Sequence, residues 1–271
     1  MPEHPRLAVS TGPLWRLSVD EVFAAAKAVG ADGVEILVSQ DRETQSPEPL
    51  EKLANRHDLP IVAIHAPLLL LTRRVYTSDP LEKIRRTIEL SRALDVGVIV
   101  LHPPYLWQVK YSLWLLHELE EAAGDHTLVT MENMYPTHVG GRTLAFHRFL
   151  SLDSLRRFDH LTLDTSHLAV AGEDIVDAYR RLADKVAHIH LSDNRGKGRD
   201  SHAPLGEGIL PIADFCRSLD GPALRSICLE INAGPAATDR GRLEQVLGAS
   251  LETVRSNLPA PSTEPPGPAA T

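Results

Sequence analysis

Cysteine, long apolar runs and clustered basic residues are all scarce in this chain. The two cysteines, Cys216 and Cys228, stand alone, so a disulfide framework and a thiolate zinc motif are both excluded. No stretch approaches the roughly 18 apolar residues of a membrane span, and the opening MPEHPRLAVS lacks the basic-then-apolar pattern of a signal peptide. We therefore expect a cytoplasmic protein with no membrane partner.

The net charge gives only weak evidence about whether the protein binds nucleic acid. The net charge is −8 and there is no basic block, which disfavours nucleic acid as a partner. A local basic rim can nevertheless operate within an acidic protein, so nucleic acid stays open as a partner at this point.

Apolar segments suited to buried strands recur along the chain and alternate with helical patterns. Each segment is rich in Val, Ile and Leu, as expected of parallel strands that are covered on both faces. The predicted strands are 6–10, 33–37, 61–65, 98–102, 127–132, 160–164, 186–191 and 226–231. The first predicted helix is capped by Ser18 and ends at Gly30. The others span about 49–57, 79–95, 111–123, 143–157 (weaker), 175–183, 211–219 and 239–256.

Eight such alternations at intervals near 30 residues predict an α/β protein built from βαβ units. Residues 1–257 are long enough for a single (β/α)8 TIM barrel, with a doubly wound open sheet as the fallback. The segment 258–271 is rich in Pro and Ala without periodicity, and we expect it to be a disordered tail.

Histidines and acidic residues occupy the carboxyl ends of the predicted strands. Because these ends surround one mouth in a barrel, we expect the side chains to converge there. The strand-end residues are His65, His102, Glu132, Asp164, His190 and Glu230. The following loops add His167, Asp200 and His202, the last two spaced to face the same side of an extended segment. Imidazoles mixed with carboxylates and no thiolate predict Mn²⁺, Zn²⁺, Fe²⁺ or Co²⁺ rather than Ca²⁺.

Several motifs carry a resemblance to a known group of proteins. They are IHAP (64–67), LHPP (101–104), MEN (131–133), LDTSHLAVAGED (163–174), HLSDNRG (190–196), DSHAPLGEG (200–208) and LEIN (229–232). Together they resemble the xylose-isomerase-like TIM-barrel superfamily over about residues 6–256. That group contains sugar isomerases and epimerases and also apurinic-site endonucleases of the endonuclease-four type.

The resemblance implies two competing sets of roles. In the epimerases, residues that match Glu132, Asp164, His190 and Glu230 hold one Mn²⁺-type ion, and the two glutamates also act as proton acceptor and donor. In the endonucleases, residues that match all the strand-end and loop positions named above hold three zinc ions.

Sugar chemistry is favoured by the departures from the endonuclease pattern. The second-strand loop SQDRETQSPEP has one arginine, and Leu68-Leu69 stand after His65 where the endonucleases carry a Tyr-Leu wedge. We therefore predict a metal-dependent isomerase or epimerase of a sugar or sugar phosphate. The alternatives are an apurinic-site endonuclease or phosphodiesterase and, second, a non-catalytic sugar-binding barrel.

Substrate contacts are predicted from loop residues. We expect His167 and Arg195 to hold substrate oxygens, Lys197 or Arg199 to meet a phosphate, and Trp107 to wall the pocket. The expected partner is a small-molecule sugar, with nucleic acid only under the endonuclease alternative. A homo-oligomer is compatible with the sequence, which does not predict the oligomeric state.

Overall fold

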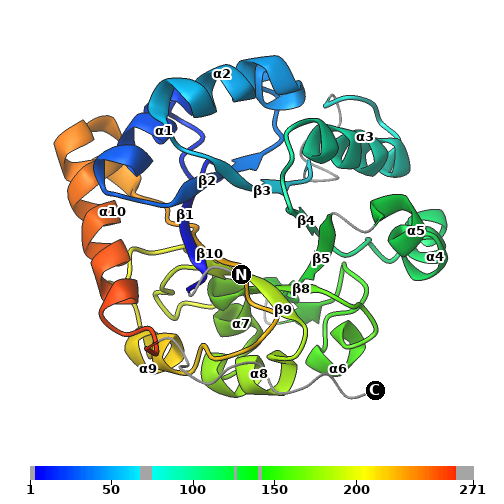
Figure 1. The fold of residues 1–271 in the computed structure, drawn as a ribbon. Coiled ribbons are helices and arrows are strands. Elements are labelled where there is room, and N and C mark those ends of the chain that lie inside the picture. Colours follow the sequence, from blue (N-terminus) through cyan, green and yellow to red (C-terminus); the bar gives the residue numbers. More distant parts are fainter. Residues whose placement is uncertain (1–3, 68–74, 125–126, 140–141, 261–271) are drawn as a thin grey trace, which may run out of the picture.

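The computed structural model describes residues 4–67, 75–124, 127–139 and 142–260. Eight parallel strands close into a barrel in the order β1-β10-β9-β8-β5-β4-β3-β2. In Figure 1 these strands form the central ring and the helices an outer ring. The predicted (β/α)8 TIM barrel is therefore confirmed, and the open-sheet fallback is excluded.

The barrel strands follow the predicted apolar segments closely. Their bounds are β1 Arg6–Ser10, β2 Gly33–Leu37, β3 Ile61–His65, β4 Val98–Leu101, β5 Leu128–Glu132, β8 Leu161–Asp164, β9 Val186–Leu191 and β10 Ser226–Leu229. The differences from prediction are one or two residues at strand ends.

The outer helices also lie where the patterns predicted most of them. They are α1 Val19–Ala28, α2 Pro47–His57, α3 Pro80–Ala93, α4 Val109–His117, α5 Leu119–Ala123, α6 Leu152–Leu155, α7 Thr165–Ala171, α8 Ile175–Leu182, α9 Ile212–Arg217 and α10 Arg240–Arg255, with 3-10 turns η1 Arg42–Gln45 and η2 Gly234–Thr238. The expected capping box at the start of α1 is present, because Ser18 and Glu21 each accept a hydrogen bond from the other's backbone.

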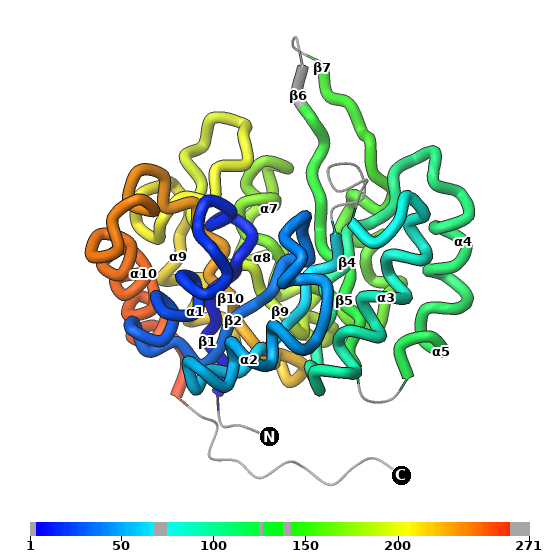
Figure 2. The backbone as a smooth tube through the Cα atoms, turned by 90° about the horizontal axis from the view of Figure 1, so that it is seen from above, coloured from blue at the N-terminus to red at the C-terminus, as the bar shows by residue number. Residues whose placement is uncertain are grey.

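Two helix predictions were wrong in detail. The predicted helix 111–123 is two helices, α4 and α5, which meet at Glu118. The weak helical stretch 143–157 holds only the short α6, while its beginning belongs to an antiparallel hairpin of β6 Thr137–Val139 and β7 Arg142–Leu144. In the sequence, the segments THV and RTL flank the dipeptide Gly140-Gly141. Short strand-forming segments on either side of Gly-Gly are typical of a hairpin, and the predicted helix did not take this signal into account. Figure 2 shows this hairpin projecting beyond the rest of the chain.

Burial follows the two faces of each strand. The main apolar core includes Val34 and Ile36 of β2 together with Phe23 of α1, so it lies between strands and helices. Inside the barrel there is a smaller apolar cluster of Ala8, Val62, Ala63, Val98 and Cys228. Glu35, between Val34 and Ile36, points into the interior of the barrel, where it meets His188 of β9. Toward the carboxyl ends of the strands, polar side chains therefore take the place of apolar ones inside the barrel.

The expected tail begins at residue 258. Residues 258–260 follow α10, whereas 261–271 lie outside the described part of the chain, as do Leu68, Leu69 and the rest of 68–74.

Candidate metal centre at the mouth of the barrel

Four of the predicted ligands meet at one point. Glu132 ends β5, Asp164 ends β8, His190 lies on β9, and Glu230 directly follows β10. Each contributes one ligand atom, and these atoms all lie within 4.8 Å of one another. Nδ1 of His190 lies 3.2 Å from Oε1 of Glu132 and 3.0 Å from Oε2 of Glu230. Parallel strands place their carboxyl ends at the same edge, which is why residues far apart in sequence converge here.

Asp164 has an oxygen that the protein itself does not satisfy. Its Oδ1 caps α7 by accepting a hydrogen bond from the backbone N–H of His167 at 2.7 Å. Its Oδ2 is fully buried and has no hydrogen-bond partner. A buried carboxylate oxygen without a partner is costly. Because it lies in a group of three carboxylates and an imidazole, the donor set fits a divalent transition metal.

His65, at the end of β3, and His102, directly after β4, both contact Glu132. Nε2 of His102 lies 2.8 Å and Nε2 of His65 lies 3.3 Å from Oε2 of Glu132. Nδ1 of His65 is directed to the carbonyl of Ala66 at 2.8 Å, which leaves Nε2 for the site. His65, Glu132 and His190 form a second group with suitable ligand spacing.

Asp200 and His202 of the following loop complete the network together with His167, which lies in α7 rather than in the predicted loop. Oδ2 of Asp200 lies 3.3 Å from Nε2 of His167 and 2.9 Å from Nε2 of His202. Asp164, His167 and His202 form a third group with ligand spacing. The structure thus brings all of the predicted metal ligands into one connected set, so the residues could hold one ion or several.

The reason given for pairing Asp200 with His202 was wrong, although the two side chains do meet. The backbone at His202 has φ of +39°, so the segment is not simply extended. The loop is instead held by Asp193, whose carboxylate accepts hydrogen bonds from the N–H groups of Gly206, Gly208 and Leu210 at 2.9–3.1 Å. Ser166 donates a hydrogen bond of 2.6 Å to Oδ1 of Asp200 and fixes that carboxylate.

The carboxylates of the centre have pKa values shifted in opposite directions. Burial raises the pKa of Asp164 to about 7. Burial acts the same way on Glu132, but the charges of His102 and His190 outweigh it and hold the pKa of Glu132 well below its usual range. His190 and His202 likewise outweigh burial at Glu230 and lower its pKa to about 2. Burial lowers the pKa of His202, but Glu230 and Asp164 outweigh it and raise that pKa to about 9.

A pocket of about 620 Å³ opens above this centre. Asp164 and His190 are buried behind it, while the other predicted ligands line it. Its wall is aromatic: the rings of Tyr105 and Trp107 stack at 4.8 Å, and Tyr105 lies 4.2 Å from the ring of His147. None of the described residues that line the pocket is lysine or arginine.

The predicted substrate contacts are only partly brought to this pocket. His167 and Trp107 line it, the latter with 58% of its surface exposed. Arg195 forms an ion pair of 2.7 Å with Glu207, and neither Arg195 nor Lys197 is among the described lining residues. Glu35, Asp193 and Asn194 were not predicted as site residues, and all three are buried. A glutamate inside the apolar strand GVEIL was the available signal for Glu35.

None of the helices in the described ranges combines the length and apolarity needed to cross a bilayer.

Comparison with known sequences finds one matching family model and several relatives that cover most of this chain. A family model for xylose isomerase-like TIM barrels matches residues 23–255. An uncharacterized protein of Mycobacterium bovis is 31% identical over 274 residues, covering 93% of this chain and 98% of the relative. Fructoselysine 3-epimerase of Shigella flexneri is 22% identical (75% and 81% covered), and a probable endonuclease 4 of Mycobacterium tuberculosis is 26% identical (71% and 82% covered).

Solved structures show the same fold. A D-tagatose 3-epimerase-like protein superimposes with a TM-score of 0.69 at 23% identity, covering 93% of this chain and 98% of the other. Endonuclease IV from Thermus thermophilus gives a TM-score of 0.63 at 22% identity, covering 92% and 99%. Relatives of both functional classes therefore share the barrel.

Proposed function

The chain belongs to the family of xylose isomerase-like TIM barrels, and on that basis we propose that it is a divalent-metal-dependent sugar isomerase or epimerase. The observation that carries the proposal is the convergence of Glu132 and Glu230 on one buried point at the floor of the pocket. The relative from Shigella flexneri, named a fructoselysine 3-epimerase, supports the same class of reaction.

Glu132, Asp164, His190 and Glu230 would hold the metal. When bound, a divalent ion polarises a carbonyl and makes the neighbouring C–H bond more acidic. Both glutamates are ionised at neutral pH, because their pKa values lie below the usual range. One of them can therefore accept the carbon-bound proton as a base. Once protonated, it can donate that proton back as an acid.

The two glutamates approach the shared point from different parts of the barrel. Glu132 ends β5 and Glu230 follows β10, with β8 and β9 between these strands in the barrel. Carboxylates placed around a substrate carbon in this way can epimerise it: the ionised one removes the proton from one face, and the other, after taking up a proton from solvent, donates that proton to the opposite face. Return to the adjacent carbon gives isomerisation.

The wall of the pocket favours this proposal over the endonuclease alternative. Lysine and arginine are common contacts of phosphodiester phosphates, and none of the described lining residues is either of them. Apolar and aromatic walls with a few converging polar groups are typical of small-molecule sites. A non-catalytic sugar-binding barrel is disfavoured because both glutamates are present in the ligand group, Glu132 buried and Glu230 partly buried.

A specific observation still supports a second candidate function. His65, His102, Asp200 and His202 extend the ligand network beyond the four residues that one ion requires. A multinuclear zinc phosphodiesterase, like the apurinic-site endonucleases that the motifs resemble, would use them all, and the relatives named endonuclease 4 and endonuclease IV support this candidate.

Solvent exchange distinguishes the two candidates. For an isomerase or epimerase, incubation with a panel of ketoses in D₂O should place deuterium next to the carbonyl. Glu230→Gln should lower that exchange by about 100-fold or more, because an amide cannot take the proton. His102→Ala should lower the exchange less than Glu230→Gln, because His102 lies outside the group of four ligand residues. Nicking of an abasic-site duplex, lost in His102→Ala, with no deuterium uptake would overturn the proposal in favour of the phosphodiesterase.

A further inference from the structure

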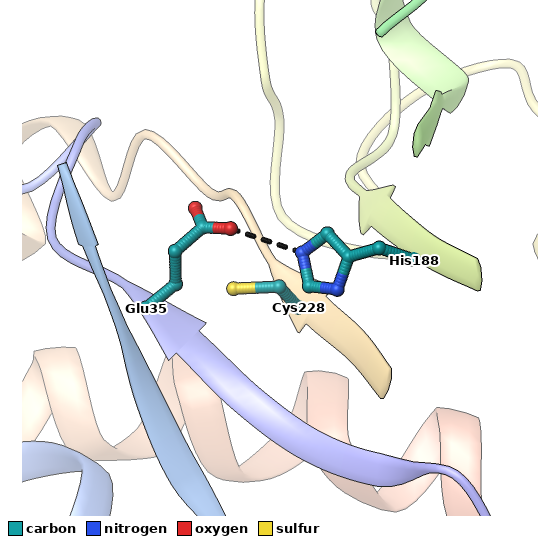
Figure 3. A group of neighbouring side chains, drawn as sticks. All are labelled: Glu35, His188 and Cys228. Carbon is teal, nitrogen blue, oxygen red and sulfur yellow. Dashed lines mark hydrogen bonds and ion pairs between the residues drawn. The ribbon is translucent and has the colours of Figure 1, made fainter. Parts of the chain in front are cut away.

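A second polar cluster lies inside the barrel, directly behind the metal centre. It consists of Glu35 on β2, His188 on β9 and Cys228 on β10, and all three side chains are completely buried. Figure 3 shows the carboxylate of Glu35 turned toward the ring of His188, with the thiol of Cys228 beside them. The spacing of their ligand atoms alone would allow a metal ion.

The hydrogen bonds of Glu35 and His188 are already complete, unlike those of Asp164 in the metal centre. Oε2 of Glu35 lies 2.9 Å from Nε2 of His188 and 3.0 Å from Nε2 of His190. Oε1 of Glu35 accepts a hydrogen bond of 2.8 Å from Ser10, and Nδ1 of His188 lies 2.7 Å from the hydroxyl of Ser226. Within the described part of the chain no oxygen of this cluster lacks a partner, whereas Oδ2 of Asp164 has none.

These contacts determine which ring nitrogen carries hydrogen. An ionised carboxylate can only accept, so His188 and His190 must both donate from Nε2 to Glu35. Nδ1 of His188 is then free to accept from the hydroxyl of Ser226. For His190, Nδ1 is the nitrogen that faces Glu132 and Glu230 at 3.2 and 3.0 Å.

We propose that Glu35 is a positioning residue that keeps hydrogen on Nε2 of His190 and thereby presents Nδ1 to the metal. His188, held by Ser226, supports Glu35 from the other side. This inference rests on the metal centre of the proposed function and adds a residue outside the four ligands. Carboxylates that hold the distal N–H of a metal-bound histidine typically contribute about 10- to 100-fold to metal affinity.

Metal affinity tests the role without reference to activity. The full chain, stripped and reloaded with Zn²⁺ or Co²⁺ against a competing chelating dye, should bind about 10- to 100-fold more weakly as Glu35→Gln. Cys228→Ser is the matched control from the same cluster, and its affinity and number of ions per chain should stay within about twofold. Unchanged affinity in Glu35→Gln would overturn the proposal.

A measurement on the wild-type protein guards against a variant that fails to fold. In the zinc-loaded chain with ¹⁵N-labelled histidine, nuclear magnetic resonance should show His190 protonated at Nε2 and metal-bound at Nδ1. Metal bound at Nε2 would overturn the proposal. A thiolate-to-cobalt charge-transfer band that disappears in Cys228→Ser would also overturn it, because the cluster itself would then bind metal.

The outcomes also separate this inference from the proposed function. A wild-type chain that binds no transition metal would overturn both. A wild-type chain that binds metal, combined with an unaffected Glu35→Gln, would overturn the role of Glu35 alone. Normal metal binding without deuterium exchange would overturn the isomerase proposal and leave Glu35 in place.

Discussion

Asp193 is the residue whose replacement should most directly expose how the site loop is built. Its buried carboxylate accepts four backbone N–H groups: Oδ1 from Asn194 and Leu210 at 2.7 and 3.0 Å, and Oδ2 from Gly206 and Gly208 at 3.1 and 2.9 Å. The loop closed by these bonds contains Asp200 and His202. In Asp193→Asn, one carboxylate oxygen becomes an NH₂ group that can only donate.

The magnitude follows from the bonds that an amide cannot accept. With the remaining oxygen in the Oδ1 position, the N–H groups of Gly206 and Gly208 would face a donor. A hydrogen bond to a charged group contributes about 1.5–3 kcal/mol, so losing two predicts a drop of about 3 kcal/mol or more in the free energy of unfolding. The loop can relax only in part, because Asp193 also pairs backbone-to-backbone with Ala203 at 2.8 Å.

Urea unfolding measures this effect. A chelator should be present, so that bound metal does not contribute to the free energy. The control is Asp184→Asn, which removes the charge from an exposed carboxylate 3.2 Å from Arg156; a surface pair of this kind contributes at most about 1 kcal/mol. If Asp193→Asn were destabilised no more than Asp184→Asn, the carboxylate would not organise the loop as argued.

Three further predictions concern the metal and the loop. Chelation should lower the thermal stability of the wild-type chain, because free metal at about 1,000 times its Kd stabilises the native state by about 4 kcal/mol; an unchanged unfolding temperature with and without chelator would contradict a tight site. Because burial raises the pKa of Asp164 to about 7, a proton competes with the metal for this carboxylate. Metal affinity measured with a chelating dye should therefore increase as the pH rises from about 6 to about 8, and equal affinities would refute this. Gly208→Ala should lower the free energy of unfolding by about 2 kcal/mol, since its Cβ would lie 2.2 Å from Oδ1 of Asp193 and 2.3 Å from the carbonyl of Asn194. Gly97→Ala, where no described atom lies within 4 Å of the new Cβ, is the matched control and should change little.

The barrel and the strand-end residues that meet at its mouth could be predicted from the sequence because the signals are local. Each strand is a short apolar run bounded by turn residues, and the polar residue that ends it is visible beside the run, as with His65 after IVAI or Asp164 after LTL. Once eight such units close into a barrel, the geometry of parallel strands brings their carboxyl ends together. The convergence of Glu132, Asp164, His190 and Glu230 follows from that alone.

Other features depended on contacts that no local pattern records. Glu35 meets His188 and His190 across 153 and 155 residues of chain, so only closure of the barrel reveals that this glutamate supports a predicted ligand. Asp193 looked like one more polar loop residue until its bonds to residues 13–17 positions later were seen. The left-handed backbone of His202 and the stack of Tyr105 on Trp107 are likewise products of loop packing. The residues at strand ends can be predicted from the residues beside them in the sequence. The groups that hold those residues in place depend on contacts between segments far apart in the sequence, which only the tertiary structure brings together.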